Sequence, residues 1–181
     1  MTQWKIDPAH SEINFKVKHL VVSSVRGNFK NFDATIESEK DDFSDAKIKF
    51  EADIKSIDTN NDQRNTHLKS ADFFDADKYP KITFVSKSIK KISDYEYKVK
   101  GDLTMRGITK EVTLDVIYNG TVEGFGGGVV AGFEVNGKLN RMDYGLKWNG
   151  LTESGSVVVS NEVKIEILAE FNEANEAVKA A

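Results

Sequence analysis

Seven stretches of the chain alternate apolar and polar residues with a period of two. The clearest are 13–19, where Phe15 and Val17 are apolar positions, and 48–54, where Phe50 is one. Successive side chains of a β-strand point to opposite faces, so each stretch predicts a strand with one apolar and one charged face. The other stretches are 82–84, 95–105, 112–118, 129–139 and 163–171.

Many strands with few helices between them bury their apolar faces either as a sandwich or as a closed barrel, and closure encloses an apolar interior. The eleven phenylalanines mostly fall on the apolar side of a strand or beside a turn, which favours a wide interior. With no internal repeat or linker among 181 residues, we expect one barrel domain over 1–172. Residues 173–181, rich in Ala, Glu and Lys, predict a flexible or frayed-helical tail.

Turn signals separate the predicted strands. Asn119-Gly120 follows the stretch 112–118 directly and predicts a type I′ turn. Ser93-Asp94 and Arg106-Gly107 predict two further turns. The glycines of 124–128 predict either a plain hairpin or a mobile lip of a cavity.

One segment breaks the period of two and predicts a short helix. Thr59 and Asp62 have the spacing of a capping box, Arg64 and Leu68 follow at helical spacing, and Pro80 prevents any continuation. A helix of about ten residues needs tertiary packing for its stability. We expect the apolar residues of this region to close one end of the barrel; they are Leu68, Phe73 and Phe74.

Charge and composition exclude several classes of function. The net charge of −4 and the scattered arginines argue against nucleic-acid binding, which needs a basic stripe. The absence of cysteine excludes disulfides, a thiol nucleophile and a zinc–thiolate site. No apolar run is long enough for an integral membrane segment. The first residues do not resemble a signal peptide, so we expect a cytoplasmic location, or a periplasmic one if a signal has been removed.

The sequence predicts no catalytic or metal-binding set. Among its three histidines the closest pair, His10 and His19, lies nine residues apart, which is about 30 Å in an extended strand. The chain has no Gly-x-Ser-x-Gly elbow, P-loop or dinucleotide fingerprint. We therefore expect no enzyme, no metal and no cofactor.

Two polar residues, His19 and Arg141, have two interpretations each, and His10 has one. His19 shares the apolar face of its strand with Phe15, so it is either a hydrogen-bonded core histidine or a polar group that meets a ligand inside a cavity. Arg141 either pairs with Asp143 or another carboxylate as an internal strut, or binds a ligand phosphate or carbonyl. His10 follows the turn signal Asp7-Pro8 and is expected to cap that turn.

Several short motifs together resemble the YceI family from Trp4 to about Phe171. Each motif is weak alone, but the combination is specific. In chain order they are Trp4-x-x-Asp7-x-x-His10-Ser11, Phe15-x-Val17-x-His19, Gly27-x-Phe29, Ser56-Ile57-Asp58-Thr59, Arg64-x-x-His67-Leu68-Lys69-Ser70, Phe73-Phe74 with Tyr79-Pro80, Gly101-Asp102-Leu103-Thr104-Met105-Arg106-Gly107, and Arg141-x-Asp143-Tyr144-Gly145.

The resemblance implies an all-β fold, an extended antiparallel lipocalin-like β-barrel with a short capping helix and a long apolar tunnel. It also implies binding of a polyisoprenoid, an isoprenoid quinone or another long amphiphile. The family has no established catalytic set, so the resemblance assigns none here. Many members carry a periplasmic signal, and the opening of this sequence departs from them in that respect.

We therefore predict a protein that sequesters or carries a long-chain lipid inside the barrel. Two alternatives stay open, a stress or interaction protein with a filled core, and an enzyme on isoprenoid or quinone substrates with His19 or His10 as base. A homodimer through an unpaired edge strand is compatible with the pattern. His19 and Arg141 are the polar ligand candidates. The predicted tunnel-lining residues are Phe15, Val17, Phe50, Phe84, Leu103, Leu114, Phe133 and Ile165.

Overall fold

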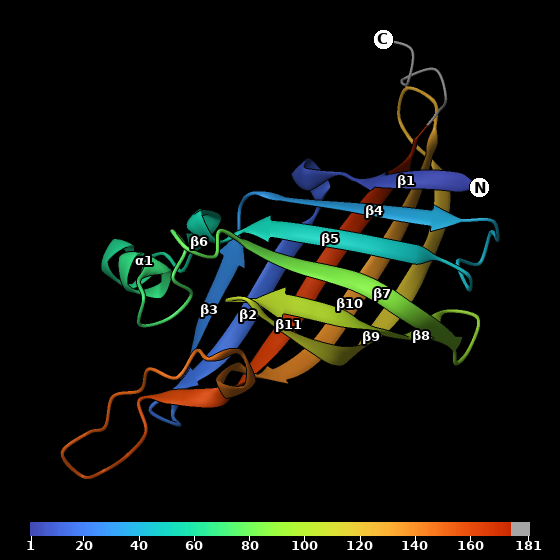
Figure 1. Cartoon of the computed structure of the whole chain (residues 1–181). Helices are drawn as coiled ribbons and strands as arrows, with labels where there is room; N and C mark the ends of the chain where they lie inside the picture. The colour runs from blue at the N-terminus through green and yellow to red at the C-terminus, as the bar shows by residue number, and fades with distance from the viewer. Residues whose placement is uncertain (175–181) are drawn as a thin grey trace.

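The structure, a computed structural model, describes residues 1–174 and is built almost entirely of antiparallel strands (Figure 1). One α-helix, α1 (Asp62–Lys69), and three short 3-10 segments, η1 (Pro8–His10), η2 (Ile54–Ser56) and η3 (Arg141–Tyr144), accompany them. The strands are β1 (Thr2–Ile6), β2 (Glu12–His19), β3 (Ser23–Phe29), β4 (Phe32–Ser38), β5 (Lys47–Asp53), β6 (Ile57–Asp58), β7 (Lys81–Lys91), β8 (Glu96–Met105), β9 (Ile108–Glu123), β10 (Val129–Asn140) and β11 (Val159–Glu173).

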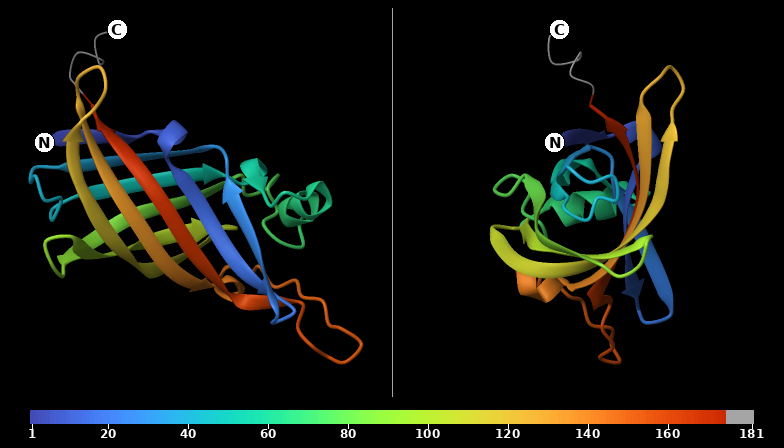
Figure 2. Two further views of the ribbon diagram at one scale, coloured as in Figure 1. Left: turned by 180° about the vertical axis from the view of Figure 1, so that it is seen from behind. Right: turned by 90° about the vertical axis from the view of Figure 1, so that its right-hand side faces the viewer.

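The strands close into a barrel through antiparallel pairs, and from β7 to β11 each strand pairs with the next one in sequence. The pairing runs β1-β4-β5-β7-β8-β9-β10-β11 and returns from β11 to β1, which makes eight strands in the closed ring. Every strand pair is antiparallel, and the strands cross the barrel axis obliquely (Figure 2). This confirms the predicted all-β barrel with one short helix.

The first three strands of the ring each consist of two segments, which lengthens one side of the barrel. β11 pairs with β1 through Phe171–Glu173 and with β2 through Val159–Leu168, so β1 and β2 form one strand interrupted at η1. β3 and β4 continue one another in the same way, as do β5 and β6. The segments β2, β3 and β6 extend toward α1 (Figure 1), and the barrel is therefore longer at this end.

The alternation of the sequence matches the two faces of the barrel wall. In β8, for example, Tyr97, Val99 and Leu103 are buried while Lys98 and Lys100 are exposed. All seven predicted stretches lie within or overlap a strand, and the turns at Ser93-Asp94 and Arg106-Gly107 join the expected strands. At the second turn Arg106 and Gly107 both have positive φ, as a type I′ turn requires.

The turn predicted at Asn119-Gly120 is wrong. β9 continues through both residues, and the register jumps from Tyr118↔Phe133 to Gly120↔Gly132, so Asn119 is an extra residue in a β-bulge. The φ of Gly120, 106°, accommodates this bulge instead of a reversal. The chain reverses at the glycines of 124–128, where the Gly124 N–H donates to the Gly128 carbonyl at 2.9 Å. The plain-hairpin interpretation of that segment is confirmed.

The predicted helix is present but begins later than its proposed cap. Asn61, and not Thr59, is the N-cap, and its side chain accepts a hydrogen bond from the Arg64 N–H at 2.9 Å. The Thr59 side chain is buried and donates to Asn65 Oδ1 instead. At the other end of the chain β11 extends through Glu173, one residue beyond the predicted domain end, because Glu173 pairs with Trp4. The rest of the predicted tail, 175–181, lies outside the described residues.

Candidate functional site

The barrel encloses a cavity of about 680 Å³ with an apolar wall. Inward-facing side chains of the strands form this wall, and many remain half-buried, among them Phe15, Val17 and Ile165. An inward residue keeps exposed surface only where no other side chain fills the space in front of it. The interior is therefore partly unfilled, with a volume typical of small-molecule and cofactor sites.

The predicted lining residues all lie on the cavity wall. β2, β5, β7, β8, β9, β10 and β11 each contribute at least one of them, so the set surrounds the interior. Their contact with a ligand stays a prediction. The residues are Phe15, Val17, Phe50, Phe84, Leu103, Leu114, Phe133 and Ile165.

The cavity reaches the surface at the α1 end of the barrel. Its exposed lining residues are Lys18 at the end of β2, and Asn61 and Gln63 at the start of α1. Polar side chains gather around this opening on β2, α1 and η3. We name His19, Arg64, His67 and Arg141 the polar rim.

Arg141 lines the cavity but does not pair with a carboxylate as the strut interpretation expected. It is 3% exposed, and its guanidinium donates to four main-chain carbonyls of the segment 146–160. The Nη1 distances are 2.5 Å to the Leu146 oxygen and 2.8 Å to the Trp148 oxygen. Asp143 is exposed, and no ion pair of Arg141 is present within residues 1–174. Two of these carbonyls, Leu146 and Trp148, belong to the loop 146–158, and the other two, Val159 and Ser160, begin β11, so Arg141 ties the loop to the barrel wall.

Burial lowers the pKa of the Arg141 guanidinium, but an arginine stays charged in a protein. Carbonyl dipoles solvate this charge without neutralising it. A positive charge without a compensating anion thus lies in the wall of an apolar cavity.

His19 lies on the cavity wall as the alternation predicted. It is half-buried at the end of β2 and pairs in register with Val159, whose carbonyl accepts a bond from Arg141. Its side chain makes no hydrogen bond to another residue of the described chain. This placement favours the interpretation of His19 as a polar group at the cavity over that of a hydrogen-bonded core histidine.

Sequence reasoning missed Arg64 and His67 as cavity residues. Arg64 Nε donates to Thr59 Oγ1 at 2.8 Å, and Nη2 donates to the Thr59 carbonyl at 2.6 Å. The His67 ring packs edge-on against Trp148 at 4.8 Å, and its Nε2 lies 2.9 Å from an Asp72 oxygen. Helical spacing identified Arg64 only as part of a helix. Its position at the opening depends on how α1 packs against the loop 146–158, which no local pattern shows.

The opposite end of the barrel is closed by Phe43 from the β4–β5 loop. Phe43 is 5% exposed, and its ring centroid lies 5.2 Å from Trp4, 5.3 Å from Tyr118 and 5.2 Å from Phe133. Phe43 has a φ of 58°, the left-handed region that a residue with a side chain seldom adopts. Burial of the ring offsets that backbone strain. We name the loop 39–46 with this ring the aromatic plug.

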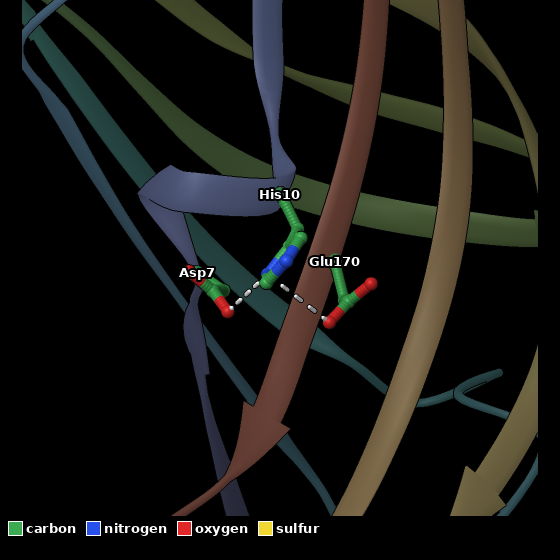
Figure 3. Close-up of side chains that lie close together, drawn as sticks. All are labelled: Asp7, His10 and Glu170. Carbon is green, nitrogen blue, oxygen red and sulfur yellow. Dashed lines mark hydrogen bonds and ion pairs between the residues drawn. The ribbon is translucent and has the colours of Figure 1, made fainter. Parts of the chain in front are cut away.

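Asp7, His10 and Glu170 form a separate cluster on the outer wall (Figure 3). The turn at Asp7-Pro8 is present as η1, but Asp7 caps it through the Ala9 N–H, and not His10 as the sequence predicted. The second Asp7 oxygen lies 2.9 Å from His10 Nδ1. Glu170 on β11 lies 3.8 Å from the same nitrogen. Both carboxylates therefore face one nitrogen, an arrangement suited to a protonated imidazole.

The pKa shifts of this cluster follow from the contacts. The hydrogen bond and charge of Asp7, followed by the charge of Glu170, raise the pKa of His10. The hydrogen bond from His10 chiefly lowers the pKa of Asp7. With His10 deprotonated, the three ligand atoms lie within 4.8 Å of one another and could hold a divalent cation. His10 does not line the cavity, so it has no access to a ligand bound there.

Comparison with known proteins identifies the family. The family model of the YceI-like domain matches residues 4–171. The chain belongs to the YceI-like family. A curated relative of this YceI-like chain, UPF0312 protein SAS2572 of Staphylococcus aureus strain MSSA476, is 44% identical over 173 residues, which is 95% of this chain and 98% of the relative.

Solved structures share the YceI-like barrel. The YCEI protein of Campylobacter jejuni is 36% identical with a TM-score of 0.75, over 87% of this chain and 90% of that one. Burkholderia cenocepacia BcnA is 24% identical with a TM-score of 0.77, over 91% and 98%. A polyisoprenoid binding domain of Saccharophagus degradans is 14% identical with a TM-score of 0.69, over 94% and 98%. At these two lower identities the likeness shows the fold alone. Within residues 1–174 no helix is long and apolar enough to cross a membrane.

Proposed function

We propose that this YceI-like chain binds a long amphiphile, a polyisoprenoid, an isoprenoid quinone or a similar lipid, in the barrel cavity, and sequesters or carries it without catalysis. The observation that carries this proposal is the unfilled apolar interior, which reaches the surface at the α1 end of the barrel. The polyisoprenoid-binding domain of similar fold supports the same class of ligand.

The energetics of such binding come mainly from the chain of the lipid. Burial of apolar surface contributes about 25 cal/mol per Å², so a long tail inside the barrel binds without specific polar contacts. The cavity wall contributes phenylalanine and branched aliphatic side chains around the whole interior. Selectivity then rests on the width of the cavity and on the few polar groups at its opening.

The cavity counts against the filled-core alternative, because packed cores leave few voids larger than a water molecule. The enzyme alternative has less support, because His10 lies on the outer wall and His19 has no orienting partner among the described residues. The cytoplasmic location and the homodimer expected from the sequence stay predictions.

The first experiment is extraction of the purified protein with organic solvent, followed by mass spectrometry of the extract. We expect a prenyl lipid, a quinone or another long amphiphile in stoichiometric amount. If nothing is released and added polyprenyl lipid is not taken up either, the proposed function is wrong.

A substitution inside the cavity sharpens this experiment. Val163 lies on the cavity wall in β11, and its neighbour Glu162 is exposed on the outer face. Val163→Trp fills part of the cavity and should lower the lipid content at least severalfold. Glu162→Trp places the same ring outside and should leave the lipid content unchanged. Circular dichroism confirms that both variants are folded; equal lipid content in the two would contradict a site inside the barrel.

A further inference from the structure

Two hollows of the molecule meet at the aromatic plug, at the end of the barrel opposite α1 (Figure 1). The apolar cavity extends from α1 through the barrel as far as Phe43. A second, outer hollow of about 370 Å³ lies on the other side of the plug and is bordered by Trp4, Tyr118 and Val129 together with polar side chains such as Glu173. Within residues 1–174, Phe43 is the one residue that lines both hollows.

The Phe43 ring forms the wall between the two hollows. Its centroid lies 5.2 Å from that of Phe133, which lines the cavity. On the outer side it lies 5.2 Å from the centroid of Trp4 and 5.3 Å from that of Tyr118, which both border the outer hollow. The size of one side chain therefore decides where the cavity ends.

Contacts on both sides of Phe43 hold this ring in place. The buried Tyr97 of β8 donates a hydrogen bond from its hydroxyl to the Asp42 carbonyl at 2.5 Å. Ser38 of β4 donates from Oγ to Asp45 Oδ1 at 2.6 Å. A residue with a side chain keeps a positive φ, here 58°, only where its surroundings determine it. The ring is therefore a fixed end wall of the cavity.

A fixed end wall limits the length of apolar chain that the cavity can bury. Each isoprene unit that enters removes more apolar surface from water, so the affinity rises with chain length. Once the chain reaches Phe43, any further unit must fold back or stay in water, and the affinity stops rising. Because Phe43 belongs to a loop and not to a strand, its size can change without disturbing the strand pairing of the barrel.

We propose that Phe43 sets the longest apolar chain that the barrel binds, so that this side chain selects the occupant by chain length. The inference rests on the proposed function, because a chain must first enter the cavity before the ring can stop it. It adds an upper limit of chain length, assigned to one residue, which an apolar cavity alone does not imply.

The test measures affinity along a series of prenyl alcohols that differ only in chain length, from farnesol through geranylgeraniol and its longer homologues to solanesol. Each alcohol competes with a fluorescent geranylgeranyl analogue for the delipidated full chain. We expect the dissociation constant to fall by about tenfold or more with each added isoprene unit, and then to stay constant or rise beyond one chain length. A fall that continues through solanesol would overturn the inference.

Substitutions that move the end wall in opposite directions assign the limit to Phe43. Phe43→Ala vacates the space of the ring toward the outer hollow. Because a phenyl ring and an isoprene unit are similar in size, the limit should move up by about one unit. Phe43→Leu loses less packing and should tighten the binding of the first alcohol above the wild-type limit severalfold.

Ala46 lies in the same loop and lines the cavity but not the outer hollow. Ala46→Leu adds bulk on the inner side of the wall and should weaken the binding of the longest wild-type ligand severalfold, while farnesol binds as before. The control is Phe125→Ala, an exposed phenylalanine that borders neither hollow, which should leave the limit unchanged.

The outcomes separate the two proposals. Circular dichroism shows which variants are folded, and Phe43→Leu and Ala46→Leu decide the result if Phe43→Ala does not fold. If the alcohols bind but both of these variants keep the wild-type limit, the inference is wrong while lipid binding stands. If neither the analogue nor any alcohol binds, the proposed function itself fails.

Discussion

The two ends of the barrel differ in how the cavity ends there. At the plugged end one buried aromatic ring, Phe43, fills the space between Trp4, Tyr118 and Phe133. At the α1 end the strands are longer, yet the space between α1 and the loop 146–158 is bordered by polar side chains. One end is closed by packing, and the other is open and bordered by polar groups.

This difference makes the cavity asymmetric, with a closed end at Phe43 and an open end at α1. If the proposed function holds, an amphiphile that entered at α1 would meet apolar wall as far as the ring of Phe43. Both ends of the cavity are formed by loops instead of strands, because the strand ladder ends before either of them. The barrel therefore fixes the width of the site, and the loops decide what enters and how far.

The largest effect is expected at the aromatic plug. Phe43→Ala removes a buried ring and should lower the free energy of unfolding by about 3–5 kcal/mol. Alanine keeps a Cβ, so the strain of the positive φ remains and the loss reports the ring alone. Urea denaturation measures it. The control is Phe125→Ala, a fully exposed phenylalanine in the β9–β10 turn, which should change stability by no more than about 0.5 kcal/mol. Equal losses in the two variants would show that Phe43 does not act as a plug.

A smaller and more local effect is expected at the polar end. Arg141→Lys keeps a positive charge but cannot reach the four carbonyls that the planar guanidinium holds together. We expect a loss of about 1–3 kcal/mol, because buried carbonyls lose their donors. Amide hydrogen exchange should speed up in the segment 146–160 and remain unchanged at the plug. Faster exchange at both ends would show that the two closures are coupled.

The smallest effect is a loss of stability at low pH, and we expect it first at the aromatic plug. Hydrogen bonds from Ser44 and Lys91 hold the pKa of Asp42 well below its usual range, and a hydrogen bond from Ser38 lowers the pKa of Asp45. A lowered folded-state pKa adds stability above the unfolded value of about 3.9, and this stability is lost as the pH falls through the folded value.

Hydrogen exchange at decreasing pH measures this prediction. The loop 39–46 should lose protection below about pH 4 before the segment 146–158 does, because the plug carries carboxylates with lowered pKa values. Asp45→Asn, which cannot titrate, should weaken the pH dependence of the loop. If the segment 146–158 opens first, the carboxylates of the plug do not control its stability.

Most strands of the barrel wall could be predicted from the sequence, because the alternation of apolar and polar residues is a local pattern. Alternation depends only on which side chains face inward, so the longest strands, such as β8 and β10, matched their patterns. β3 and β4 produced no such pattern. Phe29 and Phe32 both point inward although three positions separate them, since the chain changes phase at Lys30-Asn31 where the two segments meet. Small inward residues, Gly27 and Ala34, weakened the signal further.

The candidate site was predictable only where it lies on strands. Parity placed Phe15 and His19 on the cavity wall, as the structure shows. Arg64 and Trp148 reach the opening through the packing of α1 against a loop some eighty residues away in sequence. Glu170 meets His10 only because β11 lies beside the β1–β2 junction. Such contacts depend on the topology of the whole chain, and no short segment of the sequence predicts that topology.

The pairing of β11 on both of its edges has a consequence for the folding of the chain. β11 pairs with β10, β2 and β1, so the ring cannot close until the residues of this late strand have left the ribosome. Until then β1, β2 and β10 expose unpaired edges, and the contacts that close the ring, such as Ile6 with Phe171, span nearly the whole sequence. We expect closure to be a slow, late step of folding, and a nascent barrel that still lacks β11 to be the form most exposed to aggregation and to chaperones.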